Sequence, residues 1–440
     1  MQTAAAVPEH HLRRTLGLRD LVIMGIILVQ PTAPMPLFGV AQMEAKGHVV
    51  TVVLIAMVAM LFTAISYGRM ARAYPSAGSA YTYVGNEIHS SLGFLTGWSM
   101  LLDYVVNPII CTIWCSKAAG NILPDVPYAV WVFFFAGLFT FLNLRRIQST
   151  ARTNTILASL MMVVIAWVFV AVAKSIGPQT DFLRPFYDPA TFQWSSIGSG
   201  TALAVLTYIG FDGVSTLAEE VENPRRNIAI AMVLICLFIG LMSALEVYAG
   251  QLAWPYGEPF PDVDTAYVHV AGRVGGPVLF QVVNFTLLVA TIGSGGGAQL
   301  AGARLLYGMG RDGALPKGFF GKLSDGSAIP ANNVMLIGVL CALGAFAMSY
   351  QMGAELLNFG AFIGFMGVNL SALRHDWRTP GERTTMRAIL PSLGFIVCFG
   401  IWLNLSSLAK TAGFAWLAFG LIYGWYKTKG FRQTMAFREQ

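Results

Sequence analysis

Three carboxylic acids stand inside long apolar stretches of this sequence, at Asp103, Asp212 and Glu246. A charge at the centre of a membrane helix costs roughly 2.5–3.5 kcal/mol, so such residues face a bundle interior and are functional candidates. A buried carboxylate can neutralise an amine, or it can carry a proton because burial disfavours its charged form. We therefore treat all three as candidate cation-binding or proton-carrying groups.

Asp103 and Asn107 lie four residues apart and share one face of a predicted helix. Asp103 is about 11 residues into that helix, or roughly 17 Å at 1.5 Å per residue, which is near the middle of a bilayer. A functional role inside the bundle is one interpretation of this pair. The alternative is a structural aspartate that bonds a neighbouring helix.

Asp212 follows Phe211 in a stretch bounded by Gly210 and Gly213. The rings of Phe211 and Tyr208 are suited to closing over a cation. The alternative for Asp212 is a carboxylate that caps the ends of a broken helix.

Glu246 lies in the outer third of its predicted span, as Lys117 does in another. A salt bridge between the two is our expectation for Glu246. A role in carrying protons is the second interpretation.

The elements that must position these groups are membrane helices. The chain has 440 residues, of which 55% are hydrophobic and only 11% charged, whereas soluble domains carry about 25% charge. Eleven charge-free stretches have 16 residues or more, and a twelfth, from Leu92 to Gly120, is broken by Asp103 and Lys117. We predict an all-α membrane protein with twelve spans in a single domain, 1–440.

Charge asymmetry orients these spans. With the N-terminus inside, 22 of the 28 lysines and arginines fall on the inner side and five on the outer side, with Lys117 inside span 3. This bias predicts that both termini are cytoplasmic, in a multi-pass protein of the cell membrane. It also accounts for the net charge of +6 without a nucleic acid partner.

Two spans contain helix breakers. Span 1 carries Pro31, Pro34 and Pro36 near its centre, and span 6 carries Gly210 and Gly213. In lipid, freed backbone groups persist only inside protein or beside a water-filled cavity. Breaks in spans 1 and 6 are typical of an inverted five-plus-five repeat with a substrate site at its midplane. The alternative is that these residues merely kink ordinary helices.

Four segments carry a family resemblance: FTAISYGRMARAYPSAGSAYTYVG after span 2, GFLTGWSMLLDYVVNP in span 3, YIGFDGVSTLAEEVENPRRNIAIAM through spans 6 and 7, and ARLLYGMGRDGALP closing span 8. With them the chain resembles the amino acid–polyamine–organocation transporter superfamily, most of all its bacterial putrescine-importer-like branch. The resemblance implies twelve spans in a LeuT-like fold, alternating access and proton coupling. The repeats would cover about 18–176 and 196–376, with two additional helices at about 386–428.

The resemblance places a substrate site at the two breaks and on span 3. The residues at these positions are Val29, Gln30, Thr32, Asp103, Asn107, Tyr208, Ile209, Gly210, Phe211 and Asp212. Asp212, Asp103 and Glu246 are the candidate proton carriers.

Residue types that are absent from spans 1 and 8 bear on the substrate and on the coupling ion. Amino-acid carriers of this superfamily bind the substrate carboxylate on glycine amides in span 1, whereas this chain has VQPTAP. This favours a cationic amine such as putrescine. However, Pro36 stands where the putrescine-importer branch carries an acid, so an amino acid or another organocation stays an alternative. Sodium-dependent relatives use hydroxyls in span 8, and Gly295–Tyr307 contains no Ser or Thr, which favours protons.

Other classes fit the sequence poorly. The six histidines fall in tails, loops or span ends, and no His–Asp–Ser set is apparent, so we expect neither an enzyme, nor a metal site, nor a cofactor. A channel would not need two broken helices, and a receptor would want a sensing domain. The expected partners are a small-molecule substrate, protons and membrane lipid. The sequence leaves the oligomeric state open.

Overall fold

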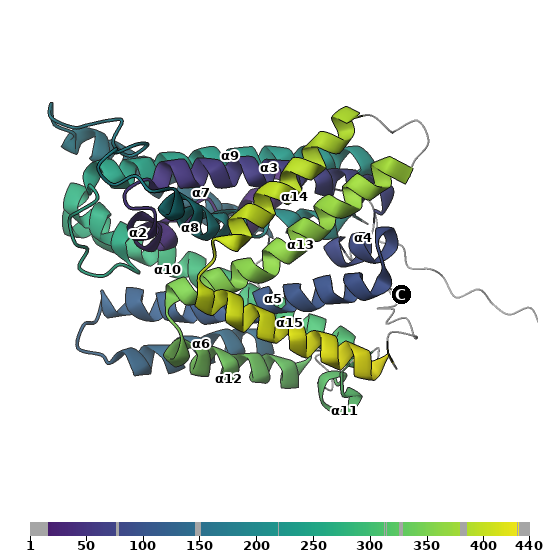
Figure 1. Ribbon diagram of the computed structural model, residues 1–440. Helices are drawn as coiled ribbons and strands as arrows, with labels where there is room; N and C mark the ends of the chain where they lie inside the picture. The colour runs from purple at the N-terminus through teal and green to yellow at the C-terminus, as the bar shows by residue number, and fades with distance from the viewer. Residues whose placement is uncertain are drawn as a thin grey trace, which may run out of the picture.

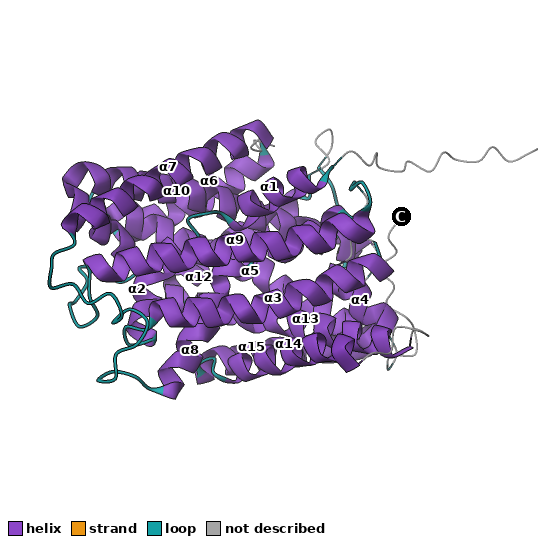
Figure 2. Cartoon of the chain, turned by 90° about the horizontal axis from the view of Figure 1, so that it is seen from above, coloured by secondary structure: helices purple, strands orange, loops and turns teal. Residues whose placement is uncertain are grey.

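The computed structural model describes residues 16–75, 79–145, 151–218, 220–311, 313, 315–324, 329–378, 385–428 and 430. Long helices run side by side, and their ends gather at two opposite faces of the bundle (Figure 1). Over the described residues the only β pairing is an isolated bridge between Leu16 and Val221 (Figure 2). The two chain ends, on which the cytoplasmic termini were predicted, lie in residues 1–15 and 431–440, outside the described ranges.

The helices follow one another along the chain with short connections. In order they are α1 Leu18–Val29, α2 Pro34–Glu44, α3 Val49–Ala73, α4 Ser79–Glu87, α5 Ser90–Gly120, α6 Tyr128–Leu144, α7 Ala151–Ser175, α8 Trp194–Ala204, the 3-10 helices η1 Val205–Tyr208 and η2 Phe211–Leu217, α9 Pro224–Ala253, α10 Ala266–Arg311, α11 Lys317–Phe320, α12 Ala331–Ala347, α13 Tyr350–Arg378, α14 Thr385–Leu403 and α15 Ser407–Lys427.

Seven helical segments of the described chain are long and apolar enough to cross a membrane, and nine if each of two bent pairs counts as one span. The bent pairs are α1 with α2, at 56°, and α14 with α15, at 114°. Two shorter apolar helices, α6 and α12, accompany them. The chain is thus an all-helical integral membrane protein, and the count of twelve spans stays a prediction.

The first predicted break is present between α1 and α2. Helix α1 ends at Val29, and Gln30 adopts a left-handed φ of 71°. Helix α2 then begins at Pro34, where a missing N–H costs nothing because the first turn has no intrahelical acceptor. Pro31 also lacks an N–H and so helps to end α1. The local chemistry of proline therefore explains the interruption.

The second predicted break is present between η1 and η2. Helix α8 tightens into η1, Ile209 is extended with ψ of 130°, and Gly210 has φ of 108°. That φ is accessible to glycine but strained for other residues. The chain then continues as η2, in a new direction.

The two breaks touch each other. A Cβ added to Gly210 would be 3.4 Å from the carbonyl oxygen of Leu28 and 3.7 Å from the Cα of Val29. A second contact joins the same two segments further along, because Leu16 donates to the Glu220 carbonyl at 3.1 Å. The interrupted helices therefore run together from their breaks to this bridge.

Small residues let α10 pack tightly in the bundle, as membrane helices commonly do. A Cβ on Gly295 would be 2.7 Å from the Phe139 ring and 2.8 Å from Cys111 Cβ. A Cβ on Gly302 would be 3.3 Å from the Tyr104 carbonyl. Helices α5, α6 and α10 thus approach at distances that larger side chains would prevent.

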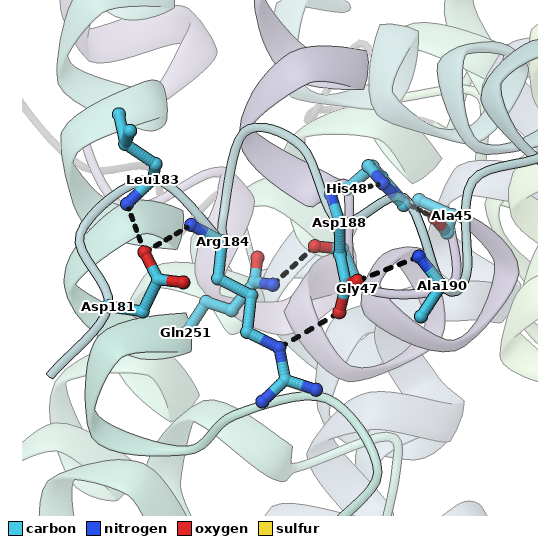
Figure 3. A network of polar contacts seen from close by, with 9 residues as sticks. All are labelled: Ala45, Gly47, His48, Asp181, Leu183, Arg184, Asp188, Ala190 and Gln251. Carbon is cyan, nitrogen blue, oxygen red and sulfur yellow. Dashed lines mark hydrogen bonds and ion pairs between the residues drawn. The ribbon is translucent and has the colours of Figure 1, made fainter. Parts of the chain in front are cut away.

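A hydrogen-bonded loop covers the face of the bundle opposite α4 and α11 (Figures 1 and 3). Asp188 accepts from the Ala190 N–H at 3.0 Å and from Arg184 Nε at 2.9 Å. The Asp188 N–H donates to His48 Nε2 at 3.0 Å, while His48 Nδ1 faces the Ala45 carbonyl at 3.0 Å. The neutral Nδ1–H tautomer satisfies both contacts and ties the loop to the start of α3.

Candidate functional site

The residues predicted at the first break point into the bundle, and two of them bond to other helices. Gln30 Nε2 donates to the carbonyl of Ala290 in α10 at 3.0 Å. Thr32 is buried, and its hydroxyl contacts Met161 Sδ in α7 at 3.8 Å. Val29 is also buried. The side chains of Gln30 and Thr32 therefore tie the first break to α10 and α7.

At the second break, the rings of Tyr208 and Phe211 are buried and already engaged. The Tyr208 hydroxyl donates to the Val53 carbonyl in α3 at 2.8 Å. The Phe211 ring packs edge-on against Tyr67, with centroids 5.8 Å apart, and lies tilted against Phe365, with centroids 5.6 Å apart. In this conformation both rings fix the break in place, and a contact of either with substrate stays a prediction.

Asp212 is the second residue of η2, close to the helix start, and the Gly213 N–H beside it donates to the Gly210 carbonyl at 3.1 Å. Its carboxylate lies beside the backbone N–H groups of Gly210 and Gly213 and its own. These contacts match the capping alternative raised from the sequence. The side chain is nevertheless only partly buried, as are Ile209 and Gly210 beside it, so a cap and an accessible negative charge coexist at this position.

Asp103 and Asn107 lie on α5, in a stretch opened by Pro108. Proline has no N–H to give to the carbonyl of Tyr104 four residues earlier, which weakens the helix beside Asp103. Asn107 Oδ1 accepts from the Cys111 thiol at 3.3 Å. Both Asp103 and Asn107 are partly accessible, although α5 is packed among other helices.

The structure brings Asp103 and Asp212 together from different helices. Asp103 lies within electrostatic range of Asp212, and Tyr104 lies within range of both carboxylates. Within the described residues, neither carboxylate forms an ion pair with a lysine, arginine or histidine. The result is a pair of acidic groups, Asp212 at the second break and Asp103 on α5, that no described cation neutralises.

Sequence reasoning missed two tyrosines at this site. Tyr67 of α3 lies within electrostatic range of Asp212, and its buried hydroxyl has no hydrogen-bond partner among the described residues. Tyr104 adjoins Asp103 in the sequence, which was the available signal. The sequence did not indicate a role for Tyr67, because a tyrosine in an apolar stretch is typical of a packed helix core.

The expected salt bridge between Glu246 and Lys117 is wrong. Lys117 Nζ lies 3.1 Å from Asp262 and 3.9 Å from Asp264, which are in the loop before α10. Glu246 is 0% exposed, and neither carboxylate oxygen has a partner among the described residues. Loop carboxylates reach the end of α5 more easily than a side chain within α9 does, and Glu246 keeps only its proton-carrying interpretation.

These features define the class of protein: a helical membrane protein with two interrupted helices and acidic groups enclosed between its spans. A family model for amino acid permeases matches residues 36–432. The chain belongs to the amino acid permease family, within the amino acid–polyamine–organocation superfamily. The resemblance noted from the sequence is thereby confirmed.

Named relatives extend along nearly the whole chain. The low-affinity putrescine importer PlaP of Escherichia coli (strain K12) is 36% identical over 432 residues, covering 96% of this chain and 95% of the relative. The branched-chain amino acid permease BcaP of Lactococcus lactis subsp. cremoris (strain MG1363) is 28% identical over 456 residues, covering 94% of each. The methylthioribose transporter of Bacillus subtilis (strain 168) is 26% identical over 460 residues, covering 95% of this chain and 94% of the relative.

Proposed function

We propose that this chain is a secondary active transporter of the cell inner membrane that imports a cationic amine such as putrescine, coupled to protons. The observation that carries the proposal is the pair Asp103 and Asp212, which lie within electrostatic range of each other with no ion pair to a described residue. Two such carboxylates are complementary to a substrate with two ammonium groups. Similarity to a putrescine importer supports the same substrate class.

The chemistry of the first break supports an amine that lacks a carboxylate. A substrate carboxylate needs N–H donors, and Pro31 and Pro34 have none. The Gln30 amide is directed to the Ala290 carbonyl instead. The hydroxyl oxygens of Tyr67 and Tyr104 can also accept hydrogen bonds from an ammonium group.

We further propose twelve spans related by a five-plus-five inverted repeat, with alternating access. On this view, repeat one covers about 18–176, repeat two about 196–376, and two additional helices about 386–428. The twelve spans are the seven long segments, the α1–α2 pair, α6, α12, and α14 and α15 taken separately. Breaks at equivalent positions of the two repeats support this arrangement, and basic residues at the α4 and α11 face support cytoplasmic termini.

In this conformation the α4 face is closed beneath the breaks. Tyr67 packs edge-on against Tyr83 of α4, with centroids 6.1 Å apart, as well as against Phe211. Ser79 and Ser215 join α4 to η2 through their hydroxyls at 2.7 Å. Movement of η2 and α4 apart is the step that we propose opens the site to the cytoplasm.

An amino acid is the second candidate substrate, because the branched-chain amino acid permease BcaP also matches along nearly the whole chain. An amino acid would bring a carboxylate into a site that already holds those of Asp103 and Asp212, whereas putrescine would not. We expect that third carboxylate to be repelled unless Asp103 or Asp212 is protonated.

Uptake by the purified protein in liposomes tests the proposal. Labelled putrescine and labelled leucine are offered in parallel, with an inward proton gradient and with the gradient collapsed by a protonophore. We expect saturable putrescine uptake that depends on the gradient and is not displaced by excess leucine. Leucine uptake without putrescine uptake would favour the amino acid alternative, and non-saturable flux would indicate a channel.

A further inference from the structure

A hollow of about 740 Å³ lies on the flank of the bundle, apart from the two breaks. It is enclosed by the end of α4, the last turns of α13 and the first turns of α14. These segments meet at the α4 and α11 end of the bundle (Figure 1). Positive-inside asymmetry assigns this end to the cytoplasm, so the hollow is at the level of the inner leaflet.

Most of the hollow's wall is apolar. Leu370 and Leu373 of α13 and Ile88 after α4 line it, and Leu370 is 37% exposed. Trp377, which is 66% exposed, stands at the rim, and tryptophan is enriched where membranes meet water. Ala388 and Ser392, one turn apart on α14, complete the wall. Such a surface suits a hydrocarbon chain.

Two arginines line the same hollow. Arg374 and Arg378 are one turn apart on α13, and neither forms a hydrogen bond or an ion pair with a described residue. Arg378 is the last residue of α13, where the free carbonyls of the helix end favour a cation. The pair therefore presents two positive charges beside an apolar wall.

The nearby acidic groups that the structure describes do not neutralise these arginines. Asp376 is bound to Arg69, with the atoms 2.7 Å apart. Glu87 is buried and accepts from the Tyr74 hydroxyl at 2.8 Å, and His375 Nδ1 lies 2.5 Å from the same oxygen. Both carboxylates are thus turned toward other partners.

We propose that this hollow, formed by Ile88, Leu370, Leu373, Arg374, Trp377 and Arg378, binds an anionic phospholipid of the inner leaflet. Basic pockets between membrane helices on the cytoplasmic side bind anionic head groups. The phosphate lies between Arg374 and Arg378, and an acyl chain follows Leu370 and Leu373 of α13. A soluble anion would gain nothing from the apolar wall, whereas a lipid is complementary to both parts.

The test measures lipid binding to the full-length purified protein by native mass spectrometry. Dioleoylphosphatidylglycerol and dioleoylphosphatidylcholine are offered in competition, and glycerol 1-phosphate serves as the soluble head group. The variant Arg374→Gln/Arg378→Gln removes both charges, and Arg374→Lys/Arg378→Lys keeps them. The matched control Arg225→Gln/Arg226→Gln removes two exposed arginines from the start of α9.

We expect wild type, the lysine variant and the α9 control to prefer phosphatidylglycerol. In the Arg374→Gln/Arg378→Gln variant, the ratio of phosphatidylglycerol to phosphatidylcholine bound should fall roughly 25-fold. This is the effect expected from removing two arginines from an anionic surface. An unchanged preference in this variant, or an equal loss in the α9 control, would overturn the proposal. Displacement of the lipid by glycerol 1-phosphate would also overturn it, because the site would then recognise a soluble anion. None of these outcomes depends on the substrate proposed above.

Discussion

Gly210 sits against the carbonyl oxygen of Leu28, at 3.4 Å from where a Cβ would stand, and holds a φ of 108°. This contact joins the two interrupted helices backbone to backbone. Glycine serves this contact because it permits the positive φ, whereas a Cβ would meet the neighbouring chain only at ordinary contact distance. The geometry of the second break thus depends on a residue without a side chain.

Replacing Gly210 with alanine should strain this junction. A left-handed conformation costs a residue with a Cβ roughly 1–2 kcal/mol, so Gly210→Ala should melt at a lower temperature and transport more slowly. Gly213→Ala is the matched control, because its Cβ would have only Leu28 Cδ1 nearby, at 3.6 Å. Thermal unfolding followed by tryptophan fluorescence checks both variants. Equal melting temperatures would show that the junction tolerates a Cβ.

A second prediction concerns the close packing of α10. Gly295→Ala places a methyl group 2.7 Å from the Phe139 ring, and overpacking of this kind typically costs 1–3 kcal/mol. Gly296→Ala meets nothing within 4 Å, so it should gain roughly 1 kcal/mol of helix propensity. The two variants should shift the melting temperature in opposite directions. Shifts of the same sign and size would contradict the packing of α10 against α6.

The breaks could be predicted from the sequence because their causes are local. Pro34 sets the start of α2 and Gly210 permits a positive φ whatever surrounds them. The partners of the breaks could not be predicted in this way. Gln30 bonds to Ala290, 260 residues away, and such a contact follows only from the packed arrangement of helices.

The acidic residues of the site could also be predicted, since a charge in an apolar run stands out against its neighbours. Tyr67 could not, because its ring is compatible with core packing in any apolar helix. The Glu246–Lys117 pairing failed for a related reason. Glu246 and Lys117 were paired because both are predicted in the outer part of the membrane. The position of the loop that holds Asp262 determines which carboxylate reaches Lys117.

The loop of Figure 3 should make stability depend on pH in the acid range. The Ala190 N–H, followed by Arg184, holds the pKa of Asp188 below its usual value. A carboxylate with a depressed pKa stabilises the fold above the ordinary aspartate pKa of about 3.9, and this contribution is lost as pH falls through the folded-state pKa.

Asp188→Asn should therefore be slightly less stable than wild type at pH 7, by less than about 1 kcal/mol because the pair is exposed. The difference should shrink below about pH 4. Arg184→Gln should show a smaller effect, since the Ala190 N–H remains. Melting temperatures from pH 3 to pH 8 check this. A constant difference between Asp188→Asn and wild type over that range would argue against the assignment.

Transport should respond to protons and not to sodium. Gly295–Tyr307 contains no Ser or Thr, and the one amide in this stretch, Gln299, donates to Thr140 at 3.0 Å and to the Val334 carbonyl at 3.1 Å. No Ser or Thr hydroxyl is therefore present in this stretch as a sodium ligand. Replacing sodium with choline at constant pH should leave uptake unchanged, whereas a protonophore should abolish it. Loss of uptake in choline would make the proton assignment wrong.

Asp212→Asn separates the two roles that the structure gives Asp212. The amide oxygen of asparagine can accept from the same backbone N–H groups near Gly210 and Gly213, so a capping role would be kept while the charge is removed. If Asp212 binds an ammonium group, affinity should fall about 10- to 150-fold, because a charged hydrogen bond contributes roughly 1.5–3 kcal/mol. Asp103→Asn is the parallel variant, and putrescine binding to each is measured by calorimetry. Wild-type affinity with an unchanged pH dependence in Asp212→Asn would leave this residue a structural cap and make Asp103 the carboxylate that recognises the amine.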